Sequence, residues 1–389
     1  MRGTSSLLIS NDVIYNCNGA SKCIVLVTPR YLPHIGGIEY VVKSMSVELC
    51  KRGYKIIVLA GEQSMNTPHH ITILKKGRYI IIRWPVLAIN DAYYIPRKGQ
   101  TLKTLIRNLV SSDDVILHVH SIHSVFPLWV GLQAKQINKK VKLVITPHYH
   151  GRGHSLIRNI LWRIYWYKIV SKALENANII HSISPLEKEK LLAHYPMISN
   201  KIVTIPNGID NSIVKYLNQR DKLNSSSKRI VYAGRIEKYK RLEIAVDLIK
   251  ELREHVPEIS LLIIGDGPHL RELKKYASKR TSNVIFMRPV TRKKYLDLLI
   301  NACATINPSR YEAYSIFSAE SLFMGITSII TPSVAKALRA KRVNTKSHLF
   351  TLIEKYAEKY GLIVCNYAEN VKPWREIISL IINKIYNDL

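Results

Sequence analysis

The alternation of strand-like and helix-like segments along almost the whole chain constrains the fold more than any other feature. Short apolar runs, such as residues 23–28 and 115–120, alternate with longer stretches of helical pattern, such as residues 38–52 and 242–253. Strands that alternate with helices form parallel sheets that those helices cover. The sequence therefore predicts an α/β protein with doubly wound, Rossmann-like sheets.

The length of 389 residues suits two domains rather than a single hydrophobic core. A polar, serine-containing connector over residues 218–228 separates two sets of strands and helices. We expect a Rossmann-like N-terminal domain over residues 1–217, of which residues 1–21 could be a loose extension. A second such domain is expected over residues 229–370, followed by a helix over residues 371–389. The two domains would face each other across a cleft.

The charge balance is strongly basic, with 58 Lys and Arg against 28 Asp and Glu and a formal net charge of +30. Such an excess favours anionic partners, such as nucleic acid, an acidic membrane surface or phosphorylated ligands. The sequence contains no recognised groove-reading module and no strand platform of aromatics interleaved with basic residues. We therefore expect no nucleic-acid partner.

Five cysteines without CxxC spacing predict a reducing compartment. No apolar run reaches the roughly 18 residues of a transmembrane helix. Residues 158–173 place Trp and Tyr among Arg and Lys, so this stretch could rest on a membrane interface or form a buried helix. We expect a cytoplasmic protein that could be peripheral at the cytoplasmic face of the membrane.

Two carboxylates, Glu312 and Glu320, lie on either side of a turn that leads from an apolar strand, residues 302–307, into a helix. Ligands of open α/β sheets bind at the carboxyl ends of strands, where helix N-termini present free N–H groups. The two acids could bind two hydroxyl-bearing parts of one ligand, such as the ribose and the hexose of a nucleotide-sugar. Ser315 and Ile316, at the helix start, are further candidate donor-binding residues. A solvated helix face is the alternative.

A cationic pair follows another apolar strand, residues 229–233. Arg235 comes directly after Gly234, and Lys240 lies five residues further on, near the next helix start. A guanidinium fork and an ammonium group at a helix N-terminus can hold a diphosphate without a metal ion. A solvated basic turn is the alternative.

Glycines follow two further strands. Gly36 and Gly37 precede the first helix, and Gly265 and Gly267 form a Gly-Asp-Gly-Pro loop after residues 261–264. Glycine lets a backbone approach a ligand closely, although a tight turn would also explain each pair. Neither a GxGxxG fingerprint nor a P-loop lysine occurs, so a Rossmann dinucleotide site and a P-loop are excluded.

Histidines gather after two strands. They are His118, His120 and His123 around one strand end and His148, His150 and His154 after another. Such a density suggests zinc, but no HExxH motif occurs and neither cluster has an acid at ligand spacing. We therefore expect no metal site, and imidazoles that hydrogen-bond hydroxyls or phosphate.

Taken in order, these motifs resemble glycosyltransferase family 4, the retaining "group 1" enzymes of the GT-B fold. The resemblance runs from about residue 25 to residue 325 and includes the Gly-Gly loop, the Thr-x-His segment ending at His148, the Pro-Asn-Gly-Ile-Asp junction, the Gly-Arg…Lys pair and the Glu-x7-Glu motif. It implies a hexosyltransferase that moves a sugar from a UDP- or GDP-linked donor to a glycan or polyprenyl-linked acceptor. The final helix would cross back to the first domain.

The resemblance also implies roles for single residues. Arg235 and Lys240 would hold the donor diphosphate, Glu320 the ribose and Glu312 the hydroxyls of the donor sugar. No metal or other cofactor is implied, because the cations and helix amides would stabilise the leaving diphosphate. In the N-terminal domain, His148 would face the sugar. Gly37 would lie near the phosphates.

Three departures from the family pattern concern these roles. Ala313-Tyr314-Ser315 stands where the family has Gly-Phe-Gly, Arg288 replaces a glycine before the base-binding loop, and no Gly-Gly pair follows Thr331. Two alternatives therefore stay open. One is a degenerate or inactive relative that acts as a binding protein, and the other is a nucleotide-sugar epimerase, which shares two facing α/β domains.

Overall fold

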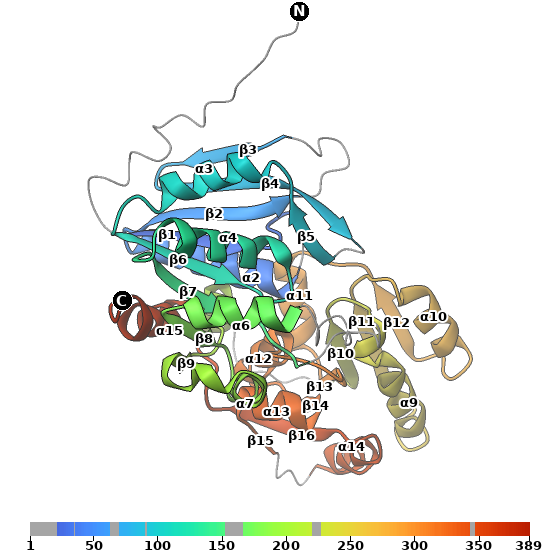
Figure 1. Ribbon diagram of the computed structural model, residues 1–389. Helices are drawn as coiled ribbons and strands as arrows, with labels where there is room; N and C mark the ends of the chain where they lie inside the picture. Colours follow the sequence, from blue (N-terminus) through green and yellow to red (C-terminus); the bar gives the residue numbers. More distant parts are fainter. Residues whose placement is uncertain are drawn as a thin grey trace, which may run out of the picture. The chain divides into compact units, whose positions relative to one another are not determined.

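The computed structural model describes residues 22–34, 36–62, 70–89, 92–151, 166–219, 227–342 and 347–389. The expected extension over residues 1–21, most of the expected linker and the first half of the segment 158–173 lie outside the described residues. The chain forms two compact units, each with its own sheet (Figure 1). The first contains the chain up to residue 183, residues 188–205 and residues 378–389; the second contains residues 184–187 and 206–377.

The first unit is built on a sheet in the strand order β3-β4-β2-β1-β6-β7-β8-β9, with β5 paired to β4. Its strands are β1 (Cys23–Thr28), β2 (Lys55–Glu62), β3 (Thr72–Lys76), β4 (Tyr79–Ile89), β5 (Ala92–Pro96), β6 (Val115–His120), β7 (Lys142–Thr146), β8 (Ile179–Ser182) and β9 (Ile202–Thr204). All neighbours are parallel except β3 and β5, which run antiparallel to β4. The central strands β1 and β6 are buried along their whole length, which explains their nearly continuous apolar sequence.

Helices cover this sheet because their apolar residues recur at helical spacing. Helix α3 buries Leu102, Leu105, Ile106 and Leu109, which form one stripe. The described helical elements before residue 205 are α2 (Gly37–Lys51), α3 (Gly99–Leu109), α4 (Val125–Ile137), α6 (Tyr167–Asn176), α7 (Pro185–His194) and η2 (Pro196–Lys201). The chain ends with α15 (Trp374–Ile381) and a π-helical turn, η4 (Ile382–Tyr386), whose last residues belong to the first unit.

The second unit has the strand order β12-β11-β10-β13-β14-β16-β15. Its strands are β10 (Arg229–Ala233), β11 (Ser260–Ile264), β12 (Val284–Met287), β13 (Ala304–Asn307), β14 (Ser328–Ile330), β15 (Ala340–Arg342) and β16 (Ile363–Ala368). Its helical elements are α8 (Asn211–Asn218), η3 (Lys238–Lys240), α9 (Leu242–Leu252), α10 (Leu270–Ser278), α11 (Arg292–Ile300), α12 (Ile316–Phe323), α13 (Pro332–Leu338) and α14 (His348–Lys359). Each unit has a separate hydrophobic core.

Residues 206–217, which the sequence analysis assigned to the first domain, group with the second unit. Backbone hydrogen bonds explain this grouping: the N–H of Ile209 donates to the carbonyl of Lys372, and the N–H of Trp374 donates to the carbonyl of Ile209, both at 3.0 Å. Gly208 lies against the indole of Trp374, where a Cβ would come within 2.7 Å of it. Asp210 then begins α8 by accepting a hydrogen bond from the N–H of Ser212.

The loops after β10 and β11 pack directly on one another. The N–H of Ile236 donates to the carbonyl of Asp266 at 2.9 Å, and the N–H of His269 donates to the carbonyl of Ile236 at 3.1 Å. A Cβ at Gly265 would collide with the carbonyl of Gly234, and Gly265 also has a positive φ of 153°. Backbone packing therefore requires a glycine at position 265, whether or not this loop also binds a ligand.

We predict that Gly265→Ala lowers the free energy of unfolding by about 3 kcal/mol, because the new methyl group meets backbone and the residue keeps a positive φ. Denaturant unfolding measures this value. Gly99→Ala is the matched control, since a Cβ there meets no described atom within 4 Å and φ is not positive. Equal stability of the two variants would contradict the packing argument.

Candidate active site

The order of the second sheet reverses between β10 and β13. The chain runs outward from β10 to β11 and β12 on one side, and from β13 to β14 on the other. At such a reversal the connections after the two central strands turn in opposite directions and leave a crevice at the carboxyl ends, where ligands of open α/β sheets bind. The cationic pair follows β10 and the two glutamates follow β13, so the sheet brings both motifs to this edge.

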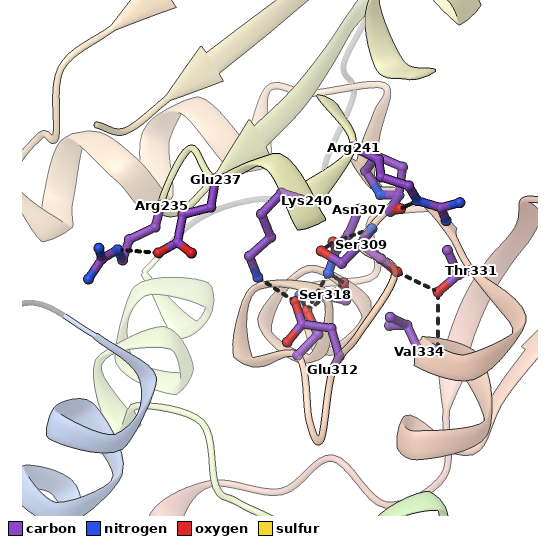
Figure 2. A network of polar contacts seen from close by, with 12 residues as sticks. Arg235, Glu237, Lys240, Arg241, Asn307, Ser309, Glu312, Ser318, Thr331 and Val334 are labelled. Atoms are coloured by element: carbon purple, nitrogen blue, oxygen red, sulfur yellow. Dashed lines mark hydrogen bonds and ion pairs between the residues drawn. The ribbon is translucent and has the colours of Figure 1, made fainter. Parts of the chain in front are cut away.

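Lys240 and Glu312 form an ion pair at this edge, with 2.5 Å between Nζ and Oε1 (Figure 2). Both side chains are only 14% exposed. Burial by itself would lower the pKa of Lys240, but the Glu312 carboxylate, Tyr239 and Tyr232 more than reverse this, and the pKa is raised. Lys240 therefore carries its charge at any physiological pH.

Arg235 lies on the same loop but is not part of this pair. Its Nε lies 2.8 Å from Oε1 of Glu237, and Figure 2 shows the side chain pointing away from Lys240. The hydroxyl of Tyr232 donates to the carbonyl of Arg235 at 2.9 Å and so fixes the backbone rather than the guanidinium. Since the Arg235 side chain is 41% exposed, it can turn toward an anion at low cost.

Glu320 lies inside α12, one turn after the helix start, and is 2% exposed. The guanidinium of Arg292 donates to both carboxylate oxygens, at 2.7 and 3.0 Å, and the hydroxyl of Tyr295 donates to Oε2 at 2.8 Å. This fork holds the buried carboxylate in one orientation. Neither Arg292 nor Tyr295 was predicted, because nothing in the sequence of α11 indicates that it faces α12.

Ser315 begins α12 as its N-cap residue, with its Oγ accepting a hydrogen bond from the N–H of Ser318. The side-chain amide of Asn307, at the end of β13, donates to the Ser315 hydroxyl at 2.8 Å. This cap fixes where α12 starts, and so fixes the helix-start position of Ile316 and the depth of Glu320.

The structure explains two features of these departures, Ser315 in place of a glycine and the absence of a glycine pair after Thr331. Ser315 has φ −93°, a backbone that any residue adopts, so a glycine is not required there. After β14, the hydroxyl of Thr331 accepts a hydrogen bond from the N–H of Val334 and donates to the carbonyl of Ser309 at 3.3 Å (Figure 2). Thr331 thus starts α13 and holds the loop after β13 without a glycine pair.

In the first unit, the Gly-Gly motif begins α2. A Cβ at Gly36 would collide with the carboxylate of Glu39, which is buried and paired with Arg30 at 2.9 Å. A Cβ at Gly37 would meet no atom of the described chain within 4 Å. Gly36 therefore leaves room for the paired carboxylate of Glu39, whereas Gly37 leaves an open surface at the start of the helix.

His148 follows β7 with a left-handed backbone, φ 51°, and is 8% exposed. Its Nε2 lies 3.2 Å from Nδ1 of the fully buried His120, and the two rings stack with centroids 5.5 Å apart. Burial, with a smaller effect of His181, lowers the pKa of His148 to about 3. Burial also lowers the pKa of His120 well below its usual value. The imidazole of His148 is therefore neutral at physiological pH.

Four further groups form a directed chain of hydrogen bonds with Tyr386: the carbonyl of Ile205 and the side chains of His181, Thr146 and His118. The carbonyl of Ile205 can only accept, so Nε2 of His181 donates to it at 2.9 Å. Nδ1 of neutral His181 then accepts from the hydroxyl of Thr146 at 2.9 Å, and the Thr146 oxygen accepts from Nε2 of His118 at 2.7 Å. Finally, Nδ1 of His118 accepts from the Tyr386 hydroxyl at 2.7 Å. The sequence could not predict Tyr386 as a partner, because 268 residues separate it from His118.

Two other histidines of the clusters form a stack of their own. His123 and His150 lie with ring centroids 4.4 Å apart, and His154 lies outside the described residues. In the part of the chain that the structure describes, no group of three or more His, Cys, Asp or Glu residues is placed to hold a metal ion. No described helix is long and apolar enough to cross a bilayer.

Comparison with protein families gives two matches that follow one another along the chain. Residues 35–212 match the model described as Glycosyltransferase Family 4, and residues 216–340 match the model described as Glycosyl transferases group 1. The chain belongs to glycosyltransferase family 4. This confirms the resemblance drawn from the motifs.

Individual relatives are distant. A phosphatidylinositol N-acetylglucosaminyltransferase subunit of Homo sapiens is 23% identical over 339 residues, which are 83% of this chain and 64% of the relative. The chain thus spans less than two thirds of that relative's length. Alpha-monoglucosyldiacylglycerol synthase of Streptococcus pneumoniae is 22% identical over 330 residues, which are 80% of this chain and 70% of the relative.

Solved structures confirm the GT-B fold. A sucrose-phosphate synthase from Thermosynechococcus elongatus matches with a TM-score of 0.64 at 16% identity, covering 94% of this chain and 98% of the other. A trehalose-6-phosphate synthase matches with a TM-score of 0.67 at 12% identity, covering 93% and 98%. At these identities the likeness concerns the fold alone.

We predict that Lys240 and Glu312 are coupled in stability. Removing one partner leaves the other charge largely buried and unpaired, so Lys240→Met and Glu312→Gln should each lower the free energy of unfolding. The loss in the double variant should be about 2 kcal/mol smaller than the sum of the two single losses. A double-mutant cycle of unfolding free energies measures this. The exposed pair Lys341 and Glu369, at 2.9 Å, is the control and should show no measurable coupling. Additive effects at Lys240 and Glu312 would contradict the pair.

We further predict that stability falls as the pH decreases from 7 to 5. The folded pKa values of His148 and His181 are lowered, to about 3 and about 4, mainly by burial, so the unfolded chain binds more protons in this range. For each histidine, the free energy of unfolding should then be about 2 kcal/mol lower at pH 5 than at pH 7. Denaturant unfolding at several pH values measures the slope. His181→Gln should reduce the slope by about one proton, and an unchanged slope would refute the assignment.

Proposed function

We propose that this protein transfers a hexose from a UDP- or GDP-linked nucleotide-sugar to a glycan or lipid-linked glycan, with retention of configuration and without a metal ion. One observation carries the proposal most directly. The Lys240–Glu312 pair lies at the strand-order reversal of the second sheet, on the same loop as the partly exposed Arg235 and on the same motif as the anchored Glu320. Family membership supports the same reaction class.

The cations would act on the donor diphosphate. Arg235 can leave Glu237 and turn its guanidinium to the phosphates, and Lys240 can contact a phosphate oxygen while it keeps Glu312 in place. As the bond from the anomeric carbon to the diphosphate oxygen breaks, negative charge grows on that oxygen, and these fixed cations stabilise it. The acceptor hydroxyl attacks the same face of the sugar, and its proton passes to the leaving diphosphate oxygen.

The two glutamates would position the donor rather than move protons. Glu312 accepts hydrogen bonds from sugar hydroxyls, and Glu320 accepts one from the ribose. Because Arg292 and Tyr295 hold Glu320 from two sides, its carboxylate needs little reorganisation when the nucleotide binds. For the first unit, the family resemblance assigns His148 a contact to the donor sugar and Gly37 a place near the phosphates.

The names of two relatives favour a lipid acceptor. One is named for a phosphatidylinositol N-acetylglucosaminyltransferase, and the other is named alpha-monoglucosyldiacylglycerol synthase. A net charge of +30 is suited to the anionic surface on which such acceptors lie. We therefore propose a cytoplasmic protein that is peripheral to the membrane.

A thermal-shift screen against UDP-, GDP- and ADP-sugars, with EDTA present, tests the donor site. We expect stabilisation by one nucleotide series, because ligands that bind only the folded state raise its apparent stability. No shift with any donor would favour the inactive relative. Conversion of the sugar without an acceptor would favour the epimerase.

Arg235→Ala should lower turnover by at least about 10²-fold, the scale of one lost transition-state contact. Its melting temperature should stay near that of the unchanged protein, since the side chain is 41% exposed. Lys238→Ala, an exposed cation on the same loop, is the matched control and should keep its activity. Full turnover of Arg235→Ala would show that Arg235 does not bind the donor diphosphate.

A further inference from the structure

His120 makes a close polar contact to the one histidine that is assigned to the donor sugar. It is the last residue of β6, it is fully buried, and its Nδ1 lies 3.2 Å from Nε2 of His148. On its other face, its ring stacks on His118 with centroids 4.5 Å apart and an interplanar angle of 25°. His120 is therefore held between two rings, and its contact to His148 is built into the core.

The contact admits only one proton between the two nitrogens, since both rings are neutral. If Nε2 of His148 carried it, Nδ1 of His120 would be bare and Nε2 of His120 would be a buried N–H. That Nε2 has no hydrogen-bond partner among the described residues. Buried N–H groups without an acceptor are rarer than buried acceptors without a donor. The arrangement with the proton on Nδ1 of His120 leaves only an unused acceptor, so it is the less costly one.

We propose that His120 is a positioning residue that donates its Nδ1–H to Nε2 of His148 and thereby fixes His148 as the Nδ1–H tautomer. A neutral imidazole that accepts at one nitrogen must carry its proton on the other. His148 then offers an N–H donor, and no basic nitrogen, to a ligand oxygen. This inference rests on the proposed function for the role of His148, but not for its tautomer.

The surrounding chain of hydrogen bonds keeps this arrangement in place. His118, on which His120 stacks, is fixed by Tyr386 at one nitrogen and by Thr146 at the other. Thr146 is the last residue of β7, two residues before His148. The end of β7 therefore fixes His118 through Thr146 and is followed directly by the loop that carries His148.

Because His148 can only donate a hydrogen bond, few roles in the reaction are open to it. It can hydrogen-bond a sugar hydroxyl or a phosphate oxygen, but it cannot remove a proton from the acceptor. This agrees with the proposed step in which the leaving diphosphate oxygen takes that proton. The neutral imidazole of His148 already carries the N–H that would bind the ligand oxygen, so this role does not require the ring to be protonated.

The first test is the tautomer itself, measured by ¹⁵N chemical shifts and long-range ¹⁵N–¹H couplings of the full chain labelled at histidine, with the His148 signals identified by their loss in His148→Gln. We expect a protonated Nδ1 and a bare Nε2 at pH 7. A protonated Nε2 on His148 would overturn the proposal. This readout needs no turnover, so a failure of the proposed function leaves it intact.

Two variants then separate positioning from mere packing. Leucine at position 120 fills the space without a donor, whereas asparagine places its amide N–H near the position of Nδ1. We expect His120→Leu to lower kcat by about 10-fold or more at little changed KM, the scale of a lost supporting hydrogen bond, and to mix the His148 tautomers. His120→Asn should bring kcat to within about threefold of the unchanged protein and should restore a single His148 tautomer. Equal kinetics and a single unchanged tautomer in His120→Leu would refute the role of His120.

Discussion

The reversal of strand order between β10 and β13 is the constraint on which the second unit depends. Because the chain leaves these neighbouring strands in opposite directions, the connections that follow them diverge beyond their carboxyl ends. Groups that are 72 residues apart in sequence, Lys240 and Glu312, can therefore meet there. The cap at Ser315 and the buried Glu320 then follow from where the chain must enter α12.

The polar groups after β10 and β13 and those around the buried histidines are satisfied differently, although the first unit also contains a buried ion pair, Arg30 with Glu39. The second unit keeps formal charges and matches each of these: Lys240 with Glu312, and Arg292 with Glu320. Around the ends of β6, β7 and β8, burial keeps the imidazoles of His118 and His181 neutral, and hydroxyls and one carbonyl join them. Paired charges suit a place where an anion arrives, since a cation can exchange one partner for another. Neutral rings suit a place that must hold geometry without attracting ions.

The sequence predicted the parts of this molecule that follow from local pattern. The strands β1, β6 and β10 and the helix α9 lie within a residue or two of their expected ends, because apolar periodicity determines them. The antiparallel pairing of β16 with β14 and β15 was not predicted, since it depends on contacts distant in sequence. The motif residues after β10 and β13 were found from their position after strands. Arg292 and Tyr295, the partners of Glu320, were not predicted, and neither was Tyr386, the partner of His118, because side-chain pairing between separate elements leaves no periodic pattern in the sequence.

The bond between Tyr386 and His118 has a consequence for the order in which the chain can fold during synthesis. His118 is made early, with the central strands of the first unit, but its partner at Nδ1 follows 268 residues later, after the whole second unit has been translated. Until then, no part of the chain made so far supplies the hydrogen bond that Nδ1 of His118 accepts from Tyr386. The unit whose synthesis begins first is therefore completed last. The second unit can form its own core before η4 is available to the first unit.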